Sequence, residues 1–550
     1  MIKTKLFDDK NAEEIFENLI STGIKQKYPN ITEETEKRIE YEKSEVKRLH
    51  FIPYFLFVRE LWGIIKSVDP CAYADGVESG CILNYLLGIT DIDPIENGLY
   101  FEGFINDRYY KKDYPHYFFN VRESMAKMVC EAIQQEMEIK GINVRTEEHF
   151  RWYSIDIHFD GENIKQGFFI TLGLSEYADL IHLCEEKTGV DCPAYTDYTD
   201  EKVWELFQKE QFENPFIEYA KEHRKSHPHT FMQLADAISG GFFIYDYYSD
   251  DQSAFLQSSY AKDGSPHYKE DWMRLVSATL GIDSAKAHYY NRELCRYQLS
   301  GKYLSKDKAL KEFIADGEKA GCEESTIQKL IDRVNPCAIN WKAIVDTLTT
   351  QIYKMAYFQA HFHDEYLNAV RTVYQEKLKN RLDDGVVILD LDADGLEPVE
   401  IKTGDEGVHF ILKIEALRMR NNTVDDFFEV YVYRGLDIPP KLAEVLRINY
   451  DDLCKAIRTD EVMKRLSVFL GNLPVITHNV PFVEKFLDFY DQNRLLKRLY
   501  CEEVITYFNK IIQPDKPIRT MRSMRKTLQI EQTITDAEAM QKILCMLIDL

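Results

Sequence analysis

YLLGITDIDP, from Tyr85 to Pro94, and FEGFIN, from Phe101 to Asn106, form the centre of the stretch that decides the N-terminal fold. The residues before them, FIPYFLFVRELWGIIKSV from Phe51 to Val68, are apolar and aromatic, a pattern that predicts a buried helix. Asp91 and Asp93 stand at a turn before proline, where an aspartate side chain accepts local hydrogen bonds. We therefore interpret both aspartates as structural residues of the turn.

Charged residues mark the flanks of this region. A Glu/Lys-rich run from Thr32 to Lys47 predicts a solvated surface helix, and another helix is expected from about Arg122 to Ile139. The charged, turn-rich EKLKNRLDDG, from Glu376 to Gly385, is the best candidate for a domain boundary. We therefore predict two domains, at residues 1–380 and 386–550.

Beyond that boundary the pattern changes to strands. VVILDLDADGL (386–396), VHFILKIEALRMR (408–420) and DFFEVYVYRG (426–435) predict three consecutive strands, with Asn421 and Asn422 as the turn between the last two. Helices with a short intervening strand follow. This order predicts a mixed α/β or α+β fold for the second domain.

Two of the later helices have recognisable ends. A helix from about Asp460 is expected to have Thr459 as its cap and Gly471 just past its end. The last helix is expected to begin at Thr535, because Glu538 three residues on completes a capping box.

The composition bounds the class of protein. With 550 residues and 45% hydrophobic content, the chain is long enough for two or more buried cores. A formal charge of -24 argues against a uniformly basic nucleic-acid binder, so any DNA contact requires a local patch. The 11 cysteines form no CxxC pair, which argues against a zinc site. No signal peptide or membrane span is recognisable, and we expect a soluble cytoplasmic protein that does not contact a membrane.

Four blocks occur in the order known from one polymerase family. They are residues 51–106, HFRWYSI (149–155), HTFMQLADAISGG (229–241) and YKMAYFQAH (353–361). In these blocks the chain resembles the bacterial replicative DNA polymerase III alpha subunit, the PolC type in particular. The resemblance implies a polymerase-beta-like palm with remnants of helical fingers and thumb in residues 1–380, and a part in DNA replication.

The chain departs from this family at its catalytic positions. The family carries two metal-binding aspartates in a segment written PDIDxNF, and His116 and Phe118 take these positions here. Ile170 takes the position of the third aspartate, and Asp75 that of a triphosphate-binding arginine. Neither imidazole nor phenyl supplies the anionic oxygens that two-metal catalysis needs, and a carboxylate repels a triphosphate. We therefore expect no polymerase activity.

A relocated metal site is one interpretation of the run SIDIHFD. Asp156, His158 and Asp160 alternate along this predicted strand and would share one face. The other interpretation, which we favour, is a half-buried strand with a polar outer face.

The second domain resembles the DEDDh exonucleases. VVILDLDADGL is similar to their opening block, DxETTGL, so that Asp390 and Asp392 take the first two acidic positions. Two carboxylates spaced by two on a strand face one side and can share a divalent cation. ITDAEAM is similar to the last block and supplies Asp536. The resemblance implies a ribonuclease-H-like exonuclease fold in residues 386–550 and a Mg²⁺ site at Asp390, Asp392 and Asp536 that is weak or absent. The alternative is that Asp390 and Asp392 are strand-end acids without a metal, and that Asp536 is a first-turn acid favoured by the helix dipole.

Two exonuclease positions are also replaced. THNVPFVEKFL, from Thr477 to Leu487, is similar to the second block but has Val483 in place of its metal-binding aspartate. Glu531 takes the position of the general-base histidine. Glu484, next to Val483, would supply a carboxylate only if its helix rotated by about 100°.

Three functions follow from these observations. The first is an inactive polymerase homologue, a pseudoenzyme that binds DNA, single-stranded or as primer-template, or replisome proteins. The second is a metal-dependent 3'-5' exonuclease that uses Asp390, Asp392 and Asp536. The third is a protein-interaction module without nucleic acid, which the acidic charge favours.

Overall fold

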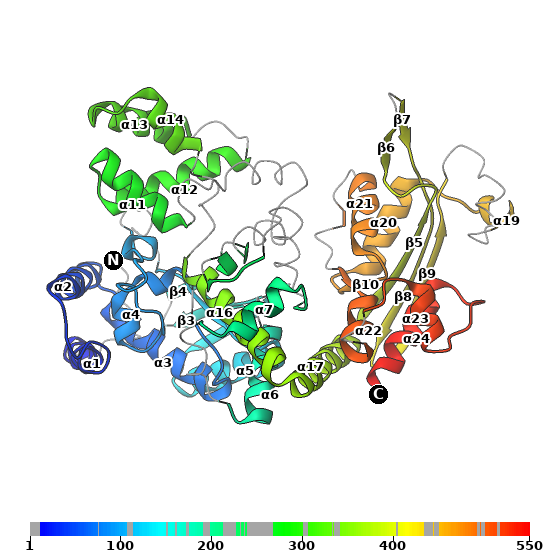
Figure 1. Ribbon diagram of the computed structural model, residues 1–550, viewed down its shortest axis with the longest axis horizontal. Helices are drawn as coiled ribbons and strands as arrows, with labels where there is room; N and C mark the ends of the chain where they lie inside the picture. Colours follow the sequence, from blue (N-terminus) through cyan, green and yellow to red (C-terminus); the bar gives the residue numbers. More distant parts are fainter. Residues whose placement is uncertain are drawn as a thin grey trace. The chain divides into compact units, whose positions relative to one another are not determined.

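The structure is a computed structural model of the chain (Figure 1). It describes residues 11–74, 76–106, 114–149, 152–159, 162–171, 175–190, 198–212, 227–231, 233–235, 237–238, 268–300, 306–332, 334, 342–402, 405–433, 444, 450–491, 495–496, 501–513 and 517–550. Asp75 and Asp160, which the sequence singled out, lie outside these residues. The chain divides into two compact units, Met1–His363 and Asp364–Leu550.

The N-terminal unit begins with three helices, α1 (Ala12–Lys27), α2 (Glu33–Arg48) and α3 (Ile52–Val68). The Thr32 hydroxyl caps α2 by accepting a hydrogen bond from the Thr35 amide at 3.2 Å. The prediction of a buried helix at Phe51 to Val68 is confirmed by α3, whose Phe55 and Leu61 side chains are fully buried.

A loop-rich segment follows α3. It contains the short helices η2 (Val77–Gly80), α4 (Ile82–Leu86) and η3 (Phe101–Gly103). Asp93 accepts hydrogen bonds from the Ile95 amide and from the Tyr28 hydroxyl, both at 2.8 Å. The structural role predicted for Asp93 is thereby confirmed.

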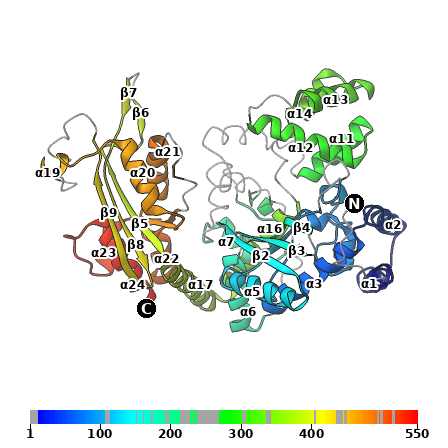
Figure 2. The same cartoon turned by 180° about the vertical axis from the view of Figure 1, so that it is seen from behind.

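The first sheet follows these helices in the chain. Its strands β1 (Tyr117–Asn120), β2 (Asn143–His149), β3 (Trp152–Phe159) and β4 (Glu162–Thr171) have the order β1-β4-β3-β2, with β1 parallel to β4 and the other pairs antiparallel. Helix α5 (Glu123–Ile139) packs with α3, and the two lie beside the sheet (Figure 2). One face of the sheet joins their core through a set of fully or nearly fully buried side chains: Tyr117, Phe119, Ile155, Ile157 and Phe168.

The elements that the structure describes after β4 in the N-terminal unit are helices. They are α6 (Ser175–Thr188), α7 (Glu201–Gln208), α11 (Lys269–Leu280), α12 (Ser284–Ser300), α13 (Lys306–Lys319), α14 (Glu324–Asp332) and α16 (Lys342–His361). Helices α11 to α14 share a separate apolar core around Trp272 and Phe313.

The C-terminal unit contains a five-stranded sheet. Its strands are β5 (Val386–Ala393), β8 (Ile411–Arg420), β9 (Thr423–Tyr431), β10 (Val475–Thr477) and β11 (Cys501–Glu503), in the order β11-β10-β5-β8-β9. Strand β8 is antiparallel to both its neighbours, while β10 and β11 run parallel to β5. Asn421 and Asn422, at φ 49° and 58°, form the predicted two-residue turn between β8 and β9.

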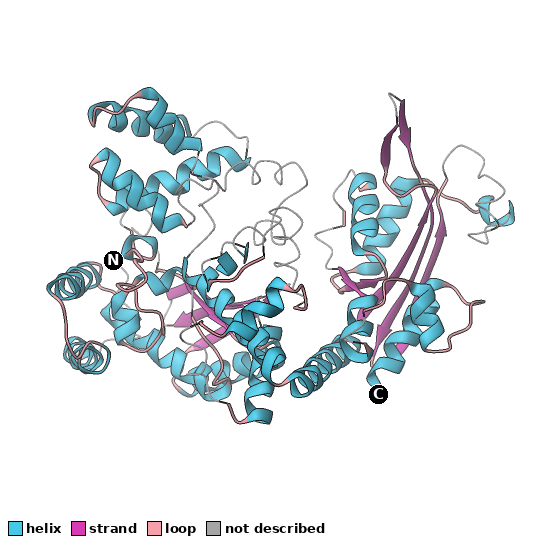
Figure 3. Ribbon diagram, viewed as in Figure 1, coloured by secondary structure: helices cyan, strands magenta, loops and turns pink. Residues whose placement is uncertain are grey.

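Helices cover both faces of this sheet (Figures 1 and 3). Val387, Leu389 and Leu391 of β5 pack with α20 (Thr459–Leu470) and α21 (Val480–Tyr490). Val386 and Ile388 pack on the other side, because alternate residues of a strand face opposite ways. The helices there are α17 (His363–Asp384), α22 (Val504–Ile512), α23 (Met521–Thr527) and α24 (Asp536–Ile548). A small hairpin, β6 (Val399–Lys402) and β7 (Asp405–Val408), and the short helix α19 (Tyr450–Leu453) complete the unit.

Two details of the sequence analysis differ from the structure. The segment Glu376 to Gly385 is not a linker, because α17 runs through it to Asp384 and buries Leu378 and Leu382 completely. Lys377 and Arg381 of this segment pair with Glu502 of β11, and the chain divides into its two compact units between His363 and Asp364 instead. Thr459 is the first residue of α20 and Arg458 precedes it as the cap, so that cap was misplaced by one residue. The capping box at Thr535 is confirmed.

Candidate functional sites

The two residues assigned from the sequence to the positions of the polymerase aspartates belong to an aromatic stack. His116 directly precedes β1, and Phe118 lies within it. Phe169 of β4 stands in register with Phe118, and their rings are stacked with centroids 5.0 Å apart and an interplanar angle of 14°. The His116 ring stacks on the same phenyl ring at 5.8 Å. No carboxylate therefore occupies the positions of His116 and Phe118, and their rings lie against Phe169.

Ile170, the residue assigned to the third aspartate position, lies in β4. Ile170, which the motif predicted, pairs with Phe119, whereas Phe169 pairs with Phe118. Because paired residues of adjacent strands face the same side of a sheet, Phe169 shares its face with Phe118. Phe169 and Ile170 are equally unable to bind a divalent cation.

The loop before α4 contains a carboxylate that the sequence analysis missed. Glu78 is fully buried, and its Oε1 accepts hydrogen bonds from the amides of Gly76 at 3.2 Å and Phe118 at 3.3 Å. A Cβ added at Gly76 would lie only 2.6 Å from the other carboxylate oxygen. In the resembling family the amides of this loop hold a triphosphate, whereas here the loop amide of Gly76 and the β1 amide of Phe118 bind a carboxylate of the chain itself. The signal that the sequence offered for Glu78 was its position two residues after Gly76.

The predicted exonuclease residues gather near the end of β5. Asp390 and Asp392 belong to β5, and Asp536 is the first residue of α24. Burial raises the pKa of Asp392 to about 7, with further increases from the negative charges of Asp390, Asp536 and Glu415, opposed by Lys413. The three predicted carboxylates are therefore close enough to influence one another electrostatically.

A histidine approaches the same cluster. His478 follows β10, and its Nδ1 lies 3.6 Å from Asp390 Oδ1, too far for a hydrogen bond but close enough for an ion pair. Burial by itself lowers the pKa of His478, but Asp390 outweighs this effect and the net pKa is raised. When it is protonated, the imidazole is a counterion for Asp390.

Two cationic side chains of this cluster, Lys413 and Arg525, were not predicted from the sequence. Lys413 Nζ lies 2.8 Å from Glu415 Oε2 and 2.8 Å from Glu429 Oε1, and Lys413 is in register with Asp392 across β5 and β8. Arg525 forms an ion pair with Asp536. A weak signal was present, since Lys413 and Glu415 are spaced by two on a strand, as Asp390 and Asp392 are.

Arg525 also fixes the segment before α24. Its guanidinium is almost fully buried and donates to the carbonyls of Glu531 at 3.1 Å, Ile534 at 3.1 Å and Thr535 at 3.0 Å. Glu531, predicted at the general-base position, is exposed, and its carboxylate accepts a hydrogen bond from the Thr533 hydroxyl at 3.2 Å. The arginine therefore binds this segment chiefly through backbone carbonyls.

The position of the lost aspartate in α21 has no substitute. Val483 is 1% exposed and belongs to the apolar core beneath α20 and α21. Burial raises the pKa of the neighbouring Glu484, and the carboxyl lies near Asp488 and Cys501. Within the described parts of the chain, no group of three or more histidine, cysteine, aspartate or glutamate side chains is placed to hold a metal ion. The residues present therefore do not fit a two-cation centre, since Arg525 and His478 already pair with two of the three carboxylates.

Comparison with known proteins agrees with both resemblances. Residues 14–140 match the family described as bacterial DNA polymerase III alpha NTPase domain, and residues 387–543 match the family described as exonuclease. DNA polymerase III subunit alpha of Aquifex aeolicus is 35% identical over 103 residues, which are 18% of this chain and 9% of that protein. The same subunit of Borreliella burgdorferi is 38% identical over 97 residues, 17% of this chain and 8% of that protein. The chain thus spans about a tenth of the length of these relatives.

One solved structure is similar to part of the chain. It is titled "3'-end specific recognition of histone mRNA stem-loop by 3'-exonuclease" and is 16% identical, covering 50% of this chain and 85% of that one with a TM-score of 0.24.

Among the described helices, none has both the length and the apolar character that crossing a membrane requires.

Proposed function

Because the chain joins a DNA polymerase III alpha-like N-terminal segment to a C-terminal exonuclease domain, we propose that it is a nucleic-acid-binding accessory or regulatory protein of DNA replication. In this proposal the first sheet and its helices are a polymerase palm with remnants of fingers and thumb. The palm binds or organises DNA without extending it.

The aromatic stack of His116, Phe169 and Phe118 carries this proposal. Two-metal nucleotidyl transfer needs several anionic oxygens around cations about 4 Å apart, and these rings supply none. The Glu78 carboxylate, which accepts the loop amide of Gly76, acts in the same direction, because its negative charge repels a triphosphate from this loop.

We further propose that the exonuclease domain is catalytically inactive. Its support is the pairing of Asp390 with His478 and of Asp536 with Arg525, together with the buried Val483. No step of hydrolysis is therefore assigned to these residues.

Primer extension and DNA binding test the leading proposal. Purified protein with Mg²⁺ and all four deoxynucleotides is expected to leave a labelled primer-template unextended. The same DNA is expected to bind at about 50 mM salt and to dissociate at about 200 mM, because phosphate contacts are screened by salt. Extension of the primer would contradict inactivity. Absence of binding even at low salt would contradict the DNA contact and favour a protein-interaction module.

The second candidate function is a divergent 3'-5' exonuclease. The observation that favours it is the gathering of Asp390, Asp392 and Asp536 within electrostatic reach. If it is correct, single-stranded DNA is degraded by the wild type and not by Asp390→Asn, and Mn²⁺ stabilises the wild type but not the variant against heat. We expect neither degradation nor stabilisation. Degradation that persists in Asp390→Asn would show a contaminating nuclease.

A further inference from the structure

Strand β9 is an outer strand of the C-terminal sheet. It pairs with β8 on one side, and among the described residues no strand pairs with its other side between Thr423 and Val430. The Val432 amide donates to the Leu412 carbonyl of β8 at 2.9 Å, and Ile457 covers the outer edge only at Tyr431 and Tyr433. Because hydrogen-bonding directions alternate along a strand, the backbone groups of Phe427 and Glu429 point outward. Asp426 already accepts the Phe427 amide, which leaves the Phe427 carbonyl and both groups of Glu429 as the outward edge.

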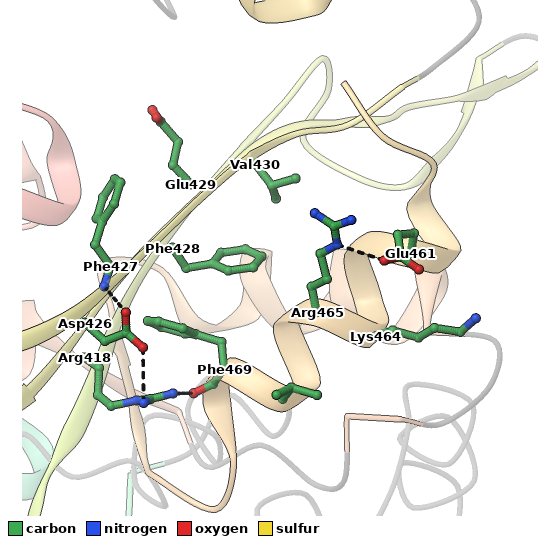
Figure 4. Close-up of a pocket in the computed structure, with 11 residues that line it drawn as sticks. Arg418, Asp426, Phe427, Phe428, Glu429, Val430, Glu461, Lys464, Arg465 and Phe469 are labelled. Atoms are coloured by element: carbon green, nitrogen blue, oxygen red, sulfur yellow. Dashed lines mark hydrogen bonds and ion pairs between the residues drawn. The ribbon is translucent and has the colours of Figure 1, made fainter. Parts of the chain in front are cut away.

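An apolar groove adjoins this edge (Figure 4). It has a volume of about 770 Å³ and lies between β9 and α20. Phe428 of β9 and Phe469 of α20 lie side by side on its wall, with ring centroids 5.3 Å apart. The Arg418 guanidinium lies 4.6 Å from the centroid of the Phe469 ring and pairs with Asp426.

Exposed apolar side chains border the groove. Val468 of α20 is 80% exposed and Phe427 of β9 is 53% exposed. Both belong to the lining of the groove. Proteins usually guard an outer strand against pairing, so apolar residues that are exposed beside a free edge indicate an interaction surface.

The charges of β9 select the kind of partner. Its charged residues, Asp425, Asp426 and Glu429, are all acidic. Asp426 pairs with Arg418, and Glu429 shares the single cation of Lys413 with Glu415, which leaves an excess of negative charge beside Glu429. If a second copy paired antiparallel with Phe427 on the two-fold axis, Asp425 would stand opposite Glu429 twice, and like charges in that position are destabilising. On the other rim, Arg465 is held by Glu461 at 2.8 Å. A strand that carries basic residues complements this edge better than β9 complements itself.

We propose that the outer edge of β9 and the adjoining groove bind an extended segment of a partner protein in which apolar residues alternate with lysine or arginine. The segment adds a strand beside Phe427 and Glu429. Its apolar side chains enter the groove beside Phe428, Val468 and Phe469, and its basic side chains lie on the other face near Glu429. Main-chain hydrogen bonds and alternate side-chain contacts are the two components of strand addition.

Fluorescent peptides of defined pattern test this proposal on the full chain. KVKVKVK is expected to bind, as measured by fluorescence anisotropy, and EVEVEVE is expected not to bind. Val468→Ser is expected to weaken binding of KVKVKVK about tenfold, because a valine side chain contributes on the order of 1.4 kcal/mol to such a contact. Ile139→Ser is the matched control, since Ile139 is 79% exposed on a helix of the other unit.

A second pair of variants tests the hydrogen-bonding edge. Glu429→Pro removes an outward amide without touching the bonds to β8, and it is expected to abolish binding. Glu429→Gln removes the same charge but keeps the amide, and it is expected to bind detectably. Equal binding of both peptides, or insensitivity to Val468→Ser and Glu429→Pro, would contradict the proposal. Dimerisation lost in these variants would assign the groove to a second copy, and displacement of KVKVKVK by oligothymidine through this groove would assign it to nucleic acid. Either result would overturn the proposal.

Discussion

Asp392→Asn is expected to raise the free energy of unfolding of the C-terminal unit by about 3–4 kcal/mol at pH 8, and by less than about 1 kcal/mol at pH 4. The reason is the raised pKa of Asp392, about 7 against a usual value of 3.8. The folded chain holds the proton more tightly than the unfolded chain, so ionisation of Asp392 destabilises the fold. The free energy of unfolding therefore has its full value below about pH 4, where Asp392 is protonated in both states, and it decreases as the pH rises through about 7. Asparagine stays neutral and avoids this loss.

Hydrogen exchange in the C-terminal unit, measured across pH under increasing denaturant, checks this expectation. Asp384→Asn is the control, because Asp384 is an exposed carboxylate on α17 of the same unit and its replacement should change stability little at either pH. A stability difference for Asp392→Asn that does not depend on pH would contradict the prediction. Such a result would mean that Asp392 is ionised without cost and that the cluster is ready to accept a cation.

Glu42→Ala is expected to destabilise the N-terminal unit by about 3–5 kcal/mol. Glu42 is fully buried in α2, and its carboxylate accepts hydrogen bonds from Arg38 Nε at 2.5 Å and from the Cys81 thiol at 3.1 Å. Arg38 in turn donates to the carbonyls of Gly80 at 2.8 Å and Leu99 at 3.3 Å. Alanine would leave the guanidinium buried without its counterion, and the loop from Gly76 to Cys81 would lose its anchor.

Tryptophan fluorescence during denaturant unfolding measures this effect. All five tryptophans precede residue 363, so the signal reports the N-terminal unit. Glu40→Ala on the same helix is the control, since the Glu40 side chain is 73% exposed and its ion pair with Lys43 contributes no more than about 1 kcal/mol. Equal effects of the two substitutions would refute the assignment of a buried ion pair to Glu42.

Local patterns predicted much of the secondary structure. The buried helix at Phe51 to Val68, the turn at Asn421 and Asn422 and the capping box at Thr535 all lie where the sequence put them. Each depends on residues no more than a few positions apart, so the chemistry that forms it is visible in the sequence.

The misplaced boundary at Glu376 to Gly385 shows the limit. Charged residues outnumber the two leucines there, and only packing shows that those leucines turn a linker-like run into a helix.

The candidate sites divide in the same way. By itself, the sequence determined which residues are present and predicted that they replace catalytic ones: His116 and Phe118 in one half, Val483 and Glu531 in the other. Only the tertiary structure decided what surrounds them. It brought Phe169 against the rings of His116 and Phe118, and it placed the Glu78 carboxylate on the amides of Gly76 and Phe118. It also placed Arg525 and Lys413 among the carboxylates of the exonuclease-like cluster. The physical reason is that most of these partners come from different elements, and which of them meet depends on strand register and helix packing, which no local pattern encodes.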